Sequence, residues 1–119
     1  MKKLNGFQVE RNRWGFWIGF ENGIVLSVQF GWGNYCDNYN NEEIDHFNTS
    51  NGKVKDVVSG TAEMAVMYGD DFITNEFDDI LNSDGSVAGH VGTDKFAELL
   101  PRLRDWKPNN KEKNETTKN

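Results

Sequence analysis

The dipeptide Asn22-Gly23 separates two runs that are rich in aromatic and β-branched side chains, Trp14–Phe20 and Ile24–Phe30. Asn-Gly is a strong hairpin signal, because both central positions of a type I′ turn need a positive φ. In the second run, apolar residues alternate with more polar ones, which is typical of a strand with one face toward a core. The sequence therefore predicts an antiparallel hairpin over residues 14–30.

Strand and turn patterns continue beyond this hairpin. Residues 31–60 are polar and rich in Asn, which predicts a long loop with at most a short element at residues 54–58. After residue 60, short apolar and β-branched segments are separated by turn residues, as in a series of strands. The Ala and Met content of Thr61–Tyr68 would also suit a helix. Strands are expected at Thr61–Tyr68, at Phe72–Phe77 and around Val87 and Val91, with turns at Gly69–Asp71 and Asn82–Gly85.

One helix is predicted near the end of the chain. Thr93 is a suitable N-cap, and apolar residues recur at helical spacing from Phe96 to Leu103. Pro101 should kink or restart this helix. The expected fold is α+β, a mostly antiparallel β meander with one C-terminal helix packed on it, forming a single domain over residues 1–107. The polar residues 108–119 are expected to be a disordered tail.

The composition and charge of the 119-residue chain limit the cellular compartment and the kinds of binding partner that can be expected. The single cysteine, Cys36, and the lack of a long apolar run predict a cytoplasmic protein without a signal peptide or membrane span. The net charge is −6, but residues 34–100 carry fourteen acidic and three basic side chains. Such a field repels duplex nucleic acid and anionic membranes and attracts basic protein surfaces, although it could also serve solubility alone.

A glycine-rich segment after the second predicted strand is the main candidate for ligand binding. The segment Gly31–Cys36 resembles the glycine-rich fingerprint of dinucleotide-binding proteins. However, Cys36 stands where the third glycine belongs, and no helix is expected after it. Its glycines would still let backbone N–H groups approach a ligand, and its aromatic rings could stack on a nucleotide base. Arginines from other parts of the chain could bind the phosphate groups of such a ligand. The alternative is a structural turn with ordinary surface arginines. The predicted ligand residues are Arg11, Arg13, Trp14, Gly31, Trp32, Gly33, Asn34, Tyr35, Arg102 and Arg104.

The other motifs give little support for catalysis. Tyr68-Gly-Asp-Asp71 matches a polymerase tetrapeptide but is expected to be a turn, because a polymerase needs a much larger scaffold. The residues 37–46 contain oxygen ligands without the EF-hand glycine. Cys36 and the two histidines lack the spacing of a zinc site, and no serine lies in a nucleophile elbow. We therefore expect a protein that is not an enzyme and uses no cofactor or metal.

Two segments, Ser27–Asn38 and Thr61–Val66, carry a resemblance to a known group of proteins. The stretch Ser-Val-Gln-Phe-Gly-Trp-Gly-Asn-Tyr-Cys and the later Ala-Glu-Met-Ala-Val resemble a family of short, largely uncharacterised bacteriophage and prophage proteins. The resemblance covers residues 14–104 loosely, and only the first motif is specific. It implies a phage origin and brings no catalytic residues with it.

The sequence leaves three functional hypotheses. The first is a phage protein that counters host defence or takes over a host function by sequestering a small anionic, nucleotide-like ligand. The second is an acidic nucleic-acid mimic that inhibits a basic host protein, and the third and weakest is a metal-dependent hydrolase built on Asp70, Asp71 and His90. A homodimer through exposed strand edges is possible in each case. The acidic residues of the second hypothesis are Asp37, Glu42, Glu43, Asp45, Asp70, Asp71, Asp78 and Asp79.

Overall fold

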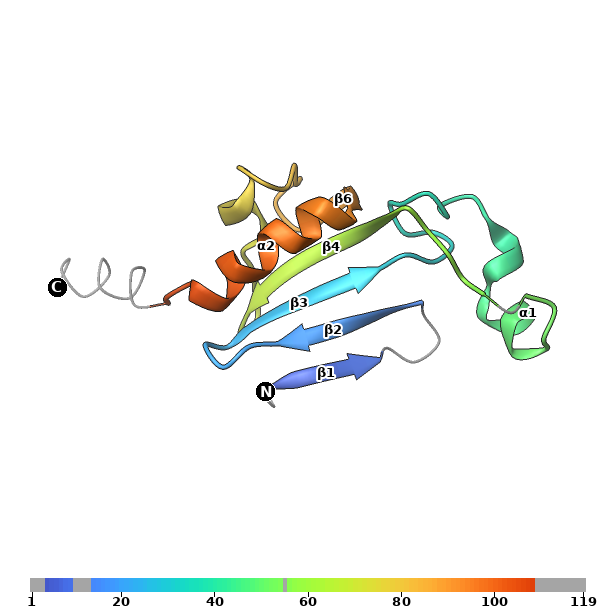
Figure 1. Cartoon of the computed structure of the whole chain (residues 1–119), viewed down its shortest axis with the longest axis horizontal. Coiled ribbons are helices and arrows are strands. Elements are labelled where there is room, and N and C mark those ends of the chain that lie inside the picture. The colour runs from blue at the N-terminus through green and yellow to red at the C-terminus, as the bar shows by residue number, and fades with distance from the viewer. Residues whose placement is uncertain (1–3, 10–13, 55, 109–119) are drawn as a thin grey trace, which may run out of the picture.

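The fold is a six-stranded antiparallel sheet with one long helix on one face, as Figure 1 shows. The structure is a computed structural model and describes residues 4–9, 14–54 and 56–108. The sheet follows the chain as a meander through its first four strands, and the remaining two both pair with the fourth strand. The strands are β1 (Gly6–Val9), β2 (Gly15–Gly19), β3 (Ile24–Gln29), β4 (Thr61–Tyr68), β5 (Asp71–Phe72) and β6 (Ala88–Gly92).

Helical elements lie in the connections and at the end of the described chain. Two short ones follow β3, a third follows β5, and the long one follows β6 directly. The predicted α+β class, with a β meander and a C-terminal helix packed on it, is confirmed. The helical elements are η1 (Glu42–Ile44), α1 (His46–Ser50), η2 (Thr74–Phe77) and α2 (Thr93–Asp105).

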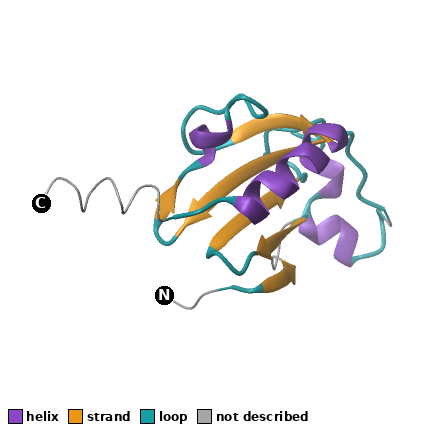
Figure 2. Cartoon of the chain, turned by 60° about the vertical axis from the view of Figure 1, so that its left-hand side comes forward, coloured by secondary structure: helices purple, strands orange, loops and turns teal. Residues whose placement is uncertain are grey.

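The hydrophobic core lies between α2 and one face of the sheet, which we call the helix face (Figure 2). Leu26 of β3 and Val66 of β4 are partners in the ladder, and both are fully buried. From α2, Leu99 and Leu103 are also fully buried, as their four-residue spacing requires for one side of a helix. Burial of this apolar surface is what holds the helix on the sheet.

The predicted hairpin forms β2 and β3, but its turn differs from the predicted type. Gly23 has a φ of 97°, whereas Asn22 does not have a positive φ, so the turn is not type I′. The Gly23 N–H donates to the Phe20 carbonyl at 3.0 Å, and the Phe20 N–H donates to the Ile24 carbonyl at 2.8 Å. This is the three-residue loop with a left-handed glycine at its last position.

Three further expectations are corrected by the structure. The predicted strand Phe72–Phe77 is extended only at Asp71–Phe72, because Thr74–Phe77 turns into the 3-10 helix η2. The described residues between 54 and 58 form no regular element. Helix α2 takes Gly92 as its N-cap, with Thr93 as its first residue.

Helix α2 also continues through Pro101 to Asp105 instead of restarting there. Pro101 is exposed, so the Ala97 carbonyl, which loses its intrahelical donor, lies on the side of the helix that faces water. The expected tail, residues 109–119, lies outside the described residues. None of the described helices is long and apolar enough to cross a membrane.

Candidate binding surface

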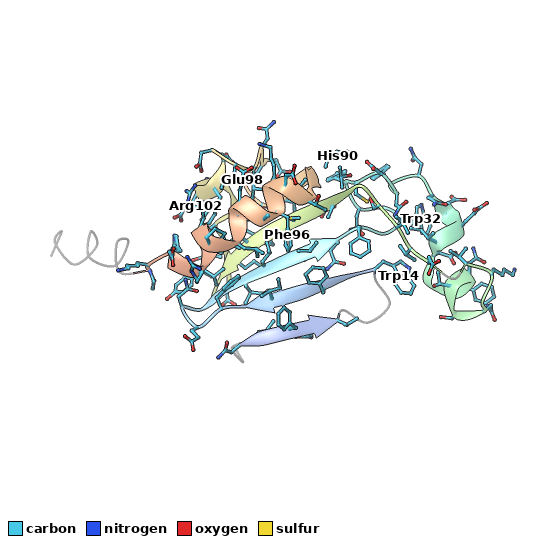
Figure 3. All side chains as sticks on the ribbon, in the orientation of Figure 1. Trp14, Trp32, His90, Phe96, Glu98 and Arg102 are labelled. Atoms are coloured by element: carbon cyan, nitrogen blue, oxygen red, sulfur yellow. The ribbon has the colours of Figure 1, made fainter. Side chains whose placement is uncertain are left out.

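Three aromatic side chains are half exposed on the loop that follows β3. Trp32 and Tyr35 each expose 50% of their surface, and Tyr39 exposes 45%. The rings of Tyr35 and Tyr39 stack, with centroids 5.6 Å apart and an angle of 13° between their planes. We call Trp32, Tyr35 and Tyr39 the aromatic patch. Figure 3 shows Trp32 at the end of the sheet, beside the connection that contains η1.

The backbone of this loop is held by short-range hydrogen bonds. The Asn34 side-chain oxygen accepts from the Gly31 N–H at 3.0 Å, and the Asn34 N–H donates to the Gly31 carbonyl at 3.2 Å. Gly33, with a φ of 85°, donates its N–H to the Tyr39 carbonyl at 3.1 Å. A residue with a Cβ would be strained at Gly33, so glycine is needed there for the turn.

Buried Asn38 joins the loop to two other segments. Its side-chain nitrogen donates to the Phe30 carbonyl at 2.9 Å and to the Val58 carbonyl at 3.0 Å. Asn38 is only 7% exposed, so these bonds satisfy a polar group that has little access to water. The end of β3 and the segment before β4 are thereby fixed relative to the aromatic patch.

Asp37 fastens the same loop to the start of β4. The Asp37 N–H donates to the Thr61 hydroxyl oxygen at 3.0 Å, and the Thr61 hydroxyl donates to the Asp37 carboxylate at 2.8 Å. The Gly60 N–H donates to the other carboxylate oxygen at 3.2 Å. The Asp37 carboxylate is thus used to close the loop.

Tyr35 is hydrogen-bonded to a β-bulge in β6. Residues Gly89 and His90 lie opposite the single residue Glu63 in the ladder between β4 and β6. His90 has a φ of 54°, and its N–H donates to the Tyr35 carbonyl at 2.8 Å. The Tyr35 N–H donates to the Glu63 carboxylate at 2.8 Å, so both backbone groups of Tyr35 are bound to the sheet. Strained backbone of this kind persists only where its surroundings fix it.

Glycine at position 89 is required by this contact. A Cβ at Gly89 would lie 2.8 Å from the Tyr35 Cβ, which is closer than side chains approach each other. The bulge and the loop therefore fit only with glycine here, and together they hold Tyr35 with its ring half exposed. The backbone that carries Tyr35 and Tyr39 is thus tied to the sheet and to the rest of the loop by hydrogen bonds.

Acidic side chains adjoin the aromatic patch along the chain. Glu42 and Glu43 of η1 are exposed and follow Tyr39 closely. The η1 segment is anchored to the sheet, because Trp14 donates its indole N–H to the Ile44 carbonyl at 2.7 Å and Ile44 is buried. Among the described residues, η1 therefore adds two exposed carboxylates next to the aromatic patch in the chain.

The predicted arginine ligands do not join the predicted loop. Arg102 and Arg104 lie near the C-terminal end of α2, at the opposite end of the sheet from Trp32 (Figure 3). Arg102 donates two hydrogen bonds to the Asp79 carboxylate, and Arg104 does the same to Asp105. Arg11 and Arg13 lie outside the described residues. Among the described residues, no arginine accompanies the aromatic patch.

The arginine pairs lower the pKa of their carboxylate partners. The hydrogen bonds from Arg102 hold the pKa of Asp79 below its ordinary value, and those from Arg104 do so for the pKa of Asp105. Arg102 also lies over the Phe77 ring, with its central carbon 5.7 Å from the ring centroid. These contacts connect α2 to η2, so Arg102 has a structural role.

Trp14, another predicted ligand residue, lies beneath the loop. Its side chain is partly buried and packs on Gly31, where an added Cβ would come within 3.2 Å of the indole. Gly31 is itself buried, whereas Gly33 is exposed. Trp14 and Gly31 therefore support the loop from beneath, and of the predicted residues in the loop itself Trp32, Gly33 and Tyr35 are exposed.

The residues of the metal-hydrolase hypothesis are also apart. Asp71 begins β5, and Gly69 and Asp70 form the tight turn between β4 and β5, which confirms the predicted turn at the Tyr-Gly-Asp-Asp motif. His90 lies in the β6 bulge. Within the described part of the chain, no group of three or more His, Cys, Asp or Glu side chains is placed to hold a metal ion.

The predicted ligand set lacks Tyr39, which is part of the aromatic patch, and the residues that support the patch, namely Asn38, Glu63 and His90. Asn38 and Glu63 act through contacts between segments far apart in the sequence, and no local pattern signals them. For His90 the sequence does contain one signal, the preceding Gly89, because a glycine within a strand indicates a bulge. No protein-family model, curated protein or solved structure matches this chain.

Proposed function

We propose that the protein is a non-catalytic binding protein that occupies a basic surface of another protein through the aromatic patch and the adjacent carboxylates of η1. This is the acidic-inhibitor hypothesis of the sequence. For a phage-type protein, the partner would be a host protein with a basic groove for nucleic acid. The observation that carries the proposal is that Trp32, Tyr35 and Tyr39 are half exposed on a hydrogen-bonded loop, and that the exposed Glu42 and Glu43 follow this loop in the chain.

Arginine and lysine side chains are the natural complement of such a surface. A guanidinium group can lie over a Trp or Tyr ring and pair with a carboxylate at the same time. Rigid aromatic rings also lose little conformational entropy on binding, which is why they are common at binding hot spots. Because the hydrogen bonds of Asn38, Asp37 and Tyr35 already fix the loop, little ordering remains for the complex to impose.

Nucleotide sequestration receives less support from this geometry. Phosphate groups need cations, but Arg102 and Arg104 are paired with carboxylates at the other end of the sheet. Near the aromatic patch, the exposed charges named above are negative, and they would repel a nucleotide. The hypothesis stays a prediction that can be tested with the same protein samples.

The test compares binding to bacterial host lysate by four immobilised proteins. These are the wild type, Trp32→Ala, the double variant Glu42→Gln/Glu43→Gln, and the control Phe72→Ala, which removes a half-exposed aromatic side chain from β5. The proposal expects a basic protein whose capture falls steeply between about 50 and 300 mM salt, because screening weakens charge pairing. Capture should be lost with both patch variants and kept with the control.

A parallel measurement addresses the nucleotide hypothesis. Native mass spectrometry of gently purified protein, and melting with a panel of nucleotides, would detect a retained or stabilising ligand. A nucleotide that raises the melting temperature of the wild type but not of Trp32→Ala would overturn the proposal in favour of sequestration. Capture that is insensitive to salt, or equal for the control and the patch variants, would also overturn it.

A further inference from the structure

Strand β1 forms an outer edge of the sheet, and its two apolar side chains are almost fully exposed. Phe7 exposes 84% of its surface and Val9 exposes 80%. Figure 1 shows β1 as the last strand on its side, with β2 as its neighbour. In antiparallel strands every second residue directs its N–H and C=O away from the neighbour, so β1 presents backbone groups that another strand could pair with.

Phe7 and Val9 lie on the helix face of the sheet. Phe7 is opposite Ile18 in the ladder, and Val9 is opposite Phe16, whose ring meets Phe96 of α2 edge-on at 6.4 Å. Helix α2 runs along β4 and does not cover β1 (Figure 1). The apolar surface of the helix face thus continues past the helix to the edge of the sheet.

The two edges of the sheet differ in how well they are protected from pairing with another strand. At the edge opposite β1, β5 has only two residues, and β6 carries the bulge at Gly89 and His90 with Tyr35 bound to it. Bulges, short strands and covering loops are the devices that protect edges. Residues Gly6–Val9 contain no charge and no proline, and their register with β2 is regular over all four pairs.

We propose that β1 is the interface of a symmetric homodimer in which two sheets join edge to edge in antiparallel fashion. A two-fold axis perpendicular to the sheet keeps the helix face of both copies on the same side. A residue of β1 on the helix face of one copy must then lie opposite a residue on the helix face of the other copy. With the axis at Gln8, Phe7 of one copy lies opposite Val9 of the other, and both exposed apolar side chains gain a partner.

A second copy fits this edge better than an unrelated strand does. Self-pairing at Gln8 matches both apolar positions at once and brings no like charges from Gly6–Val9 into contact. A register centred on Phe7 would instead set Val9 against Asn5. The inference is independent of the proposed partner surface, which lies around Trp32 and η1.

The first test is the mass in solution. At about 100 µM, light scattering with size-exclusion chromatography should give twice the chain mass of 13.6 kDa for the wild type. Val9→Lys should give a single chain, because it places a charge opposite Phe7 of the second copy. The control Phe72→Lys, at an exposed apolar residue of β5, should stay dimeric. A monomeric wild type, or a dimer that survives Val9→Lys, would overturn the proposal.

The second test measures the register. Directly opposed residues in antiparallel strands have Cα atoms within the range that a disulfide spans, so Gln8→Cys should form a covalent dimer on oxidation. Phe7→Cys should form at least about tenfold less, because each introduced thiol would face Val9 of the other copy and not a second thiol. Cys36 is buried and present in both variants, and the wild type controls for it. Stronger cross-linking of Phe7→Cys would contradict the Gln8-centred interface.

Discussion

The side-chain nitrogen of Asn22 donates a hydrogen bond of 2.8 Å to the carbonyl oxygen of Leu103, 81 positions later in the chain. The same nitrogen donates to the Trp106 carbonyl at 2.8 Å, while the Asn22 oxygen accepts from the Ile24 N–H at 3.0 Å. The last carbonyls of a helix have no intrahelical donor. The hairpin turn therefore caps the C-terminal end of α2 and ties the helix to the sheet.

We expect Asn22→Ala to destabilise the protein by about 1 to 2 kcal/mol, because it removes two donated hydrogen bonds from helix-end carbonyls. The free energy of unfolding in urea measures this change. The matched control is Glu21→Ala, at the exposed neighbouring position of the same turn, and it should stay close to the wild type. Equal stability of the two variants would show that water satisfies these carbonyls as well as Asn22 does.

Local patterns were sufficient to predict part of the fold, but not β1, and not η1 or α1, which lie in the segment expected to be a long loop. The Asn22-Gly23 hairpin, the strand Thr61–Tyr68 and the helix after residue 92 all follow from periodicity and turn chemistry within one segment. The prediction was wrong at Thr74–Phe77, where tertiary contacts decide the outcome. There the Thr74 hydroxyl binds across to β4, and the chain turns instead of extending.

The candidate surface was only partly predictable. Glycines and aromatic residues after β3 drew attention to this loop, but the sequence left open whether it is exposed, and the structure places Trp32 and Tyr35 half exposed on it. The predicted grouping with Arg102 and Arg104 could not be checked from sequence, because it depends on which end of the sheet the helix end occupies. The same applies to Asn22, whose role as a cap for α2 involves a partner 81 positions away.

Asn38 should be the residue on which the loop depends most. Replacing it with Ala removes the bonds to the Phe30 and Val58 carbonyls at a buried site, so we expect a loss of about 1 to 3 kcal/mol. Amide hydrogen exchange should also speed up over residues 31–41. The exposed Asn40 provides the matched control, since Asn40→Ala should leave both quantities nearly unchanged. Wild-type exchange rates in Asn38→Ala would mean that the loop is held by other contacts.

Thr74 supplies a buried hydroxyl to two backbone groups. Its oxygen accepts from the Val66 N–H at 2.9 Å and donates to the Ser86 carbonyl at 2.7 Å, and the side chain is fully buried. Thr74→Val keeps the shape but leaves both backbone groups without this partner, for an expected loss of about 1 to 3 kcal/mol. Thr74→Ser retains the hydroxyl and should be less destabilised in the same urea measurement. A Val variant as stable as the Ser variant would contradict this role.

Asp84 should contribute a pH-dependent part of the stability. Hydrogen bonds from the backbone N–H groups of Val87 and Ser86 to its carboxylate hold the pKa of Asp84 below its ordinary value. A carboxylate with a lowered folded-state pKa stabilises the fold above its unfolded pKa of about 4, and this contribution is lost as the pH falls through the folded value.

The matching experiment compares the urea midpoints of the wild type and Asp84→Asn from pH 7 to pH 3. The variant should be less stable than the wild type at neutral pH, and the difference should shrink below about pH 4 as Asp84 becomes protonated in the wild type. Asp56→Asn, which removes an exposed carboxylate from a segment without regular structure, controls for the change in net charge. A difference that stays constant over this range would show that the negative charge of Asp84 is not what the two N–H groups stabilise.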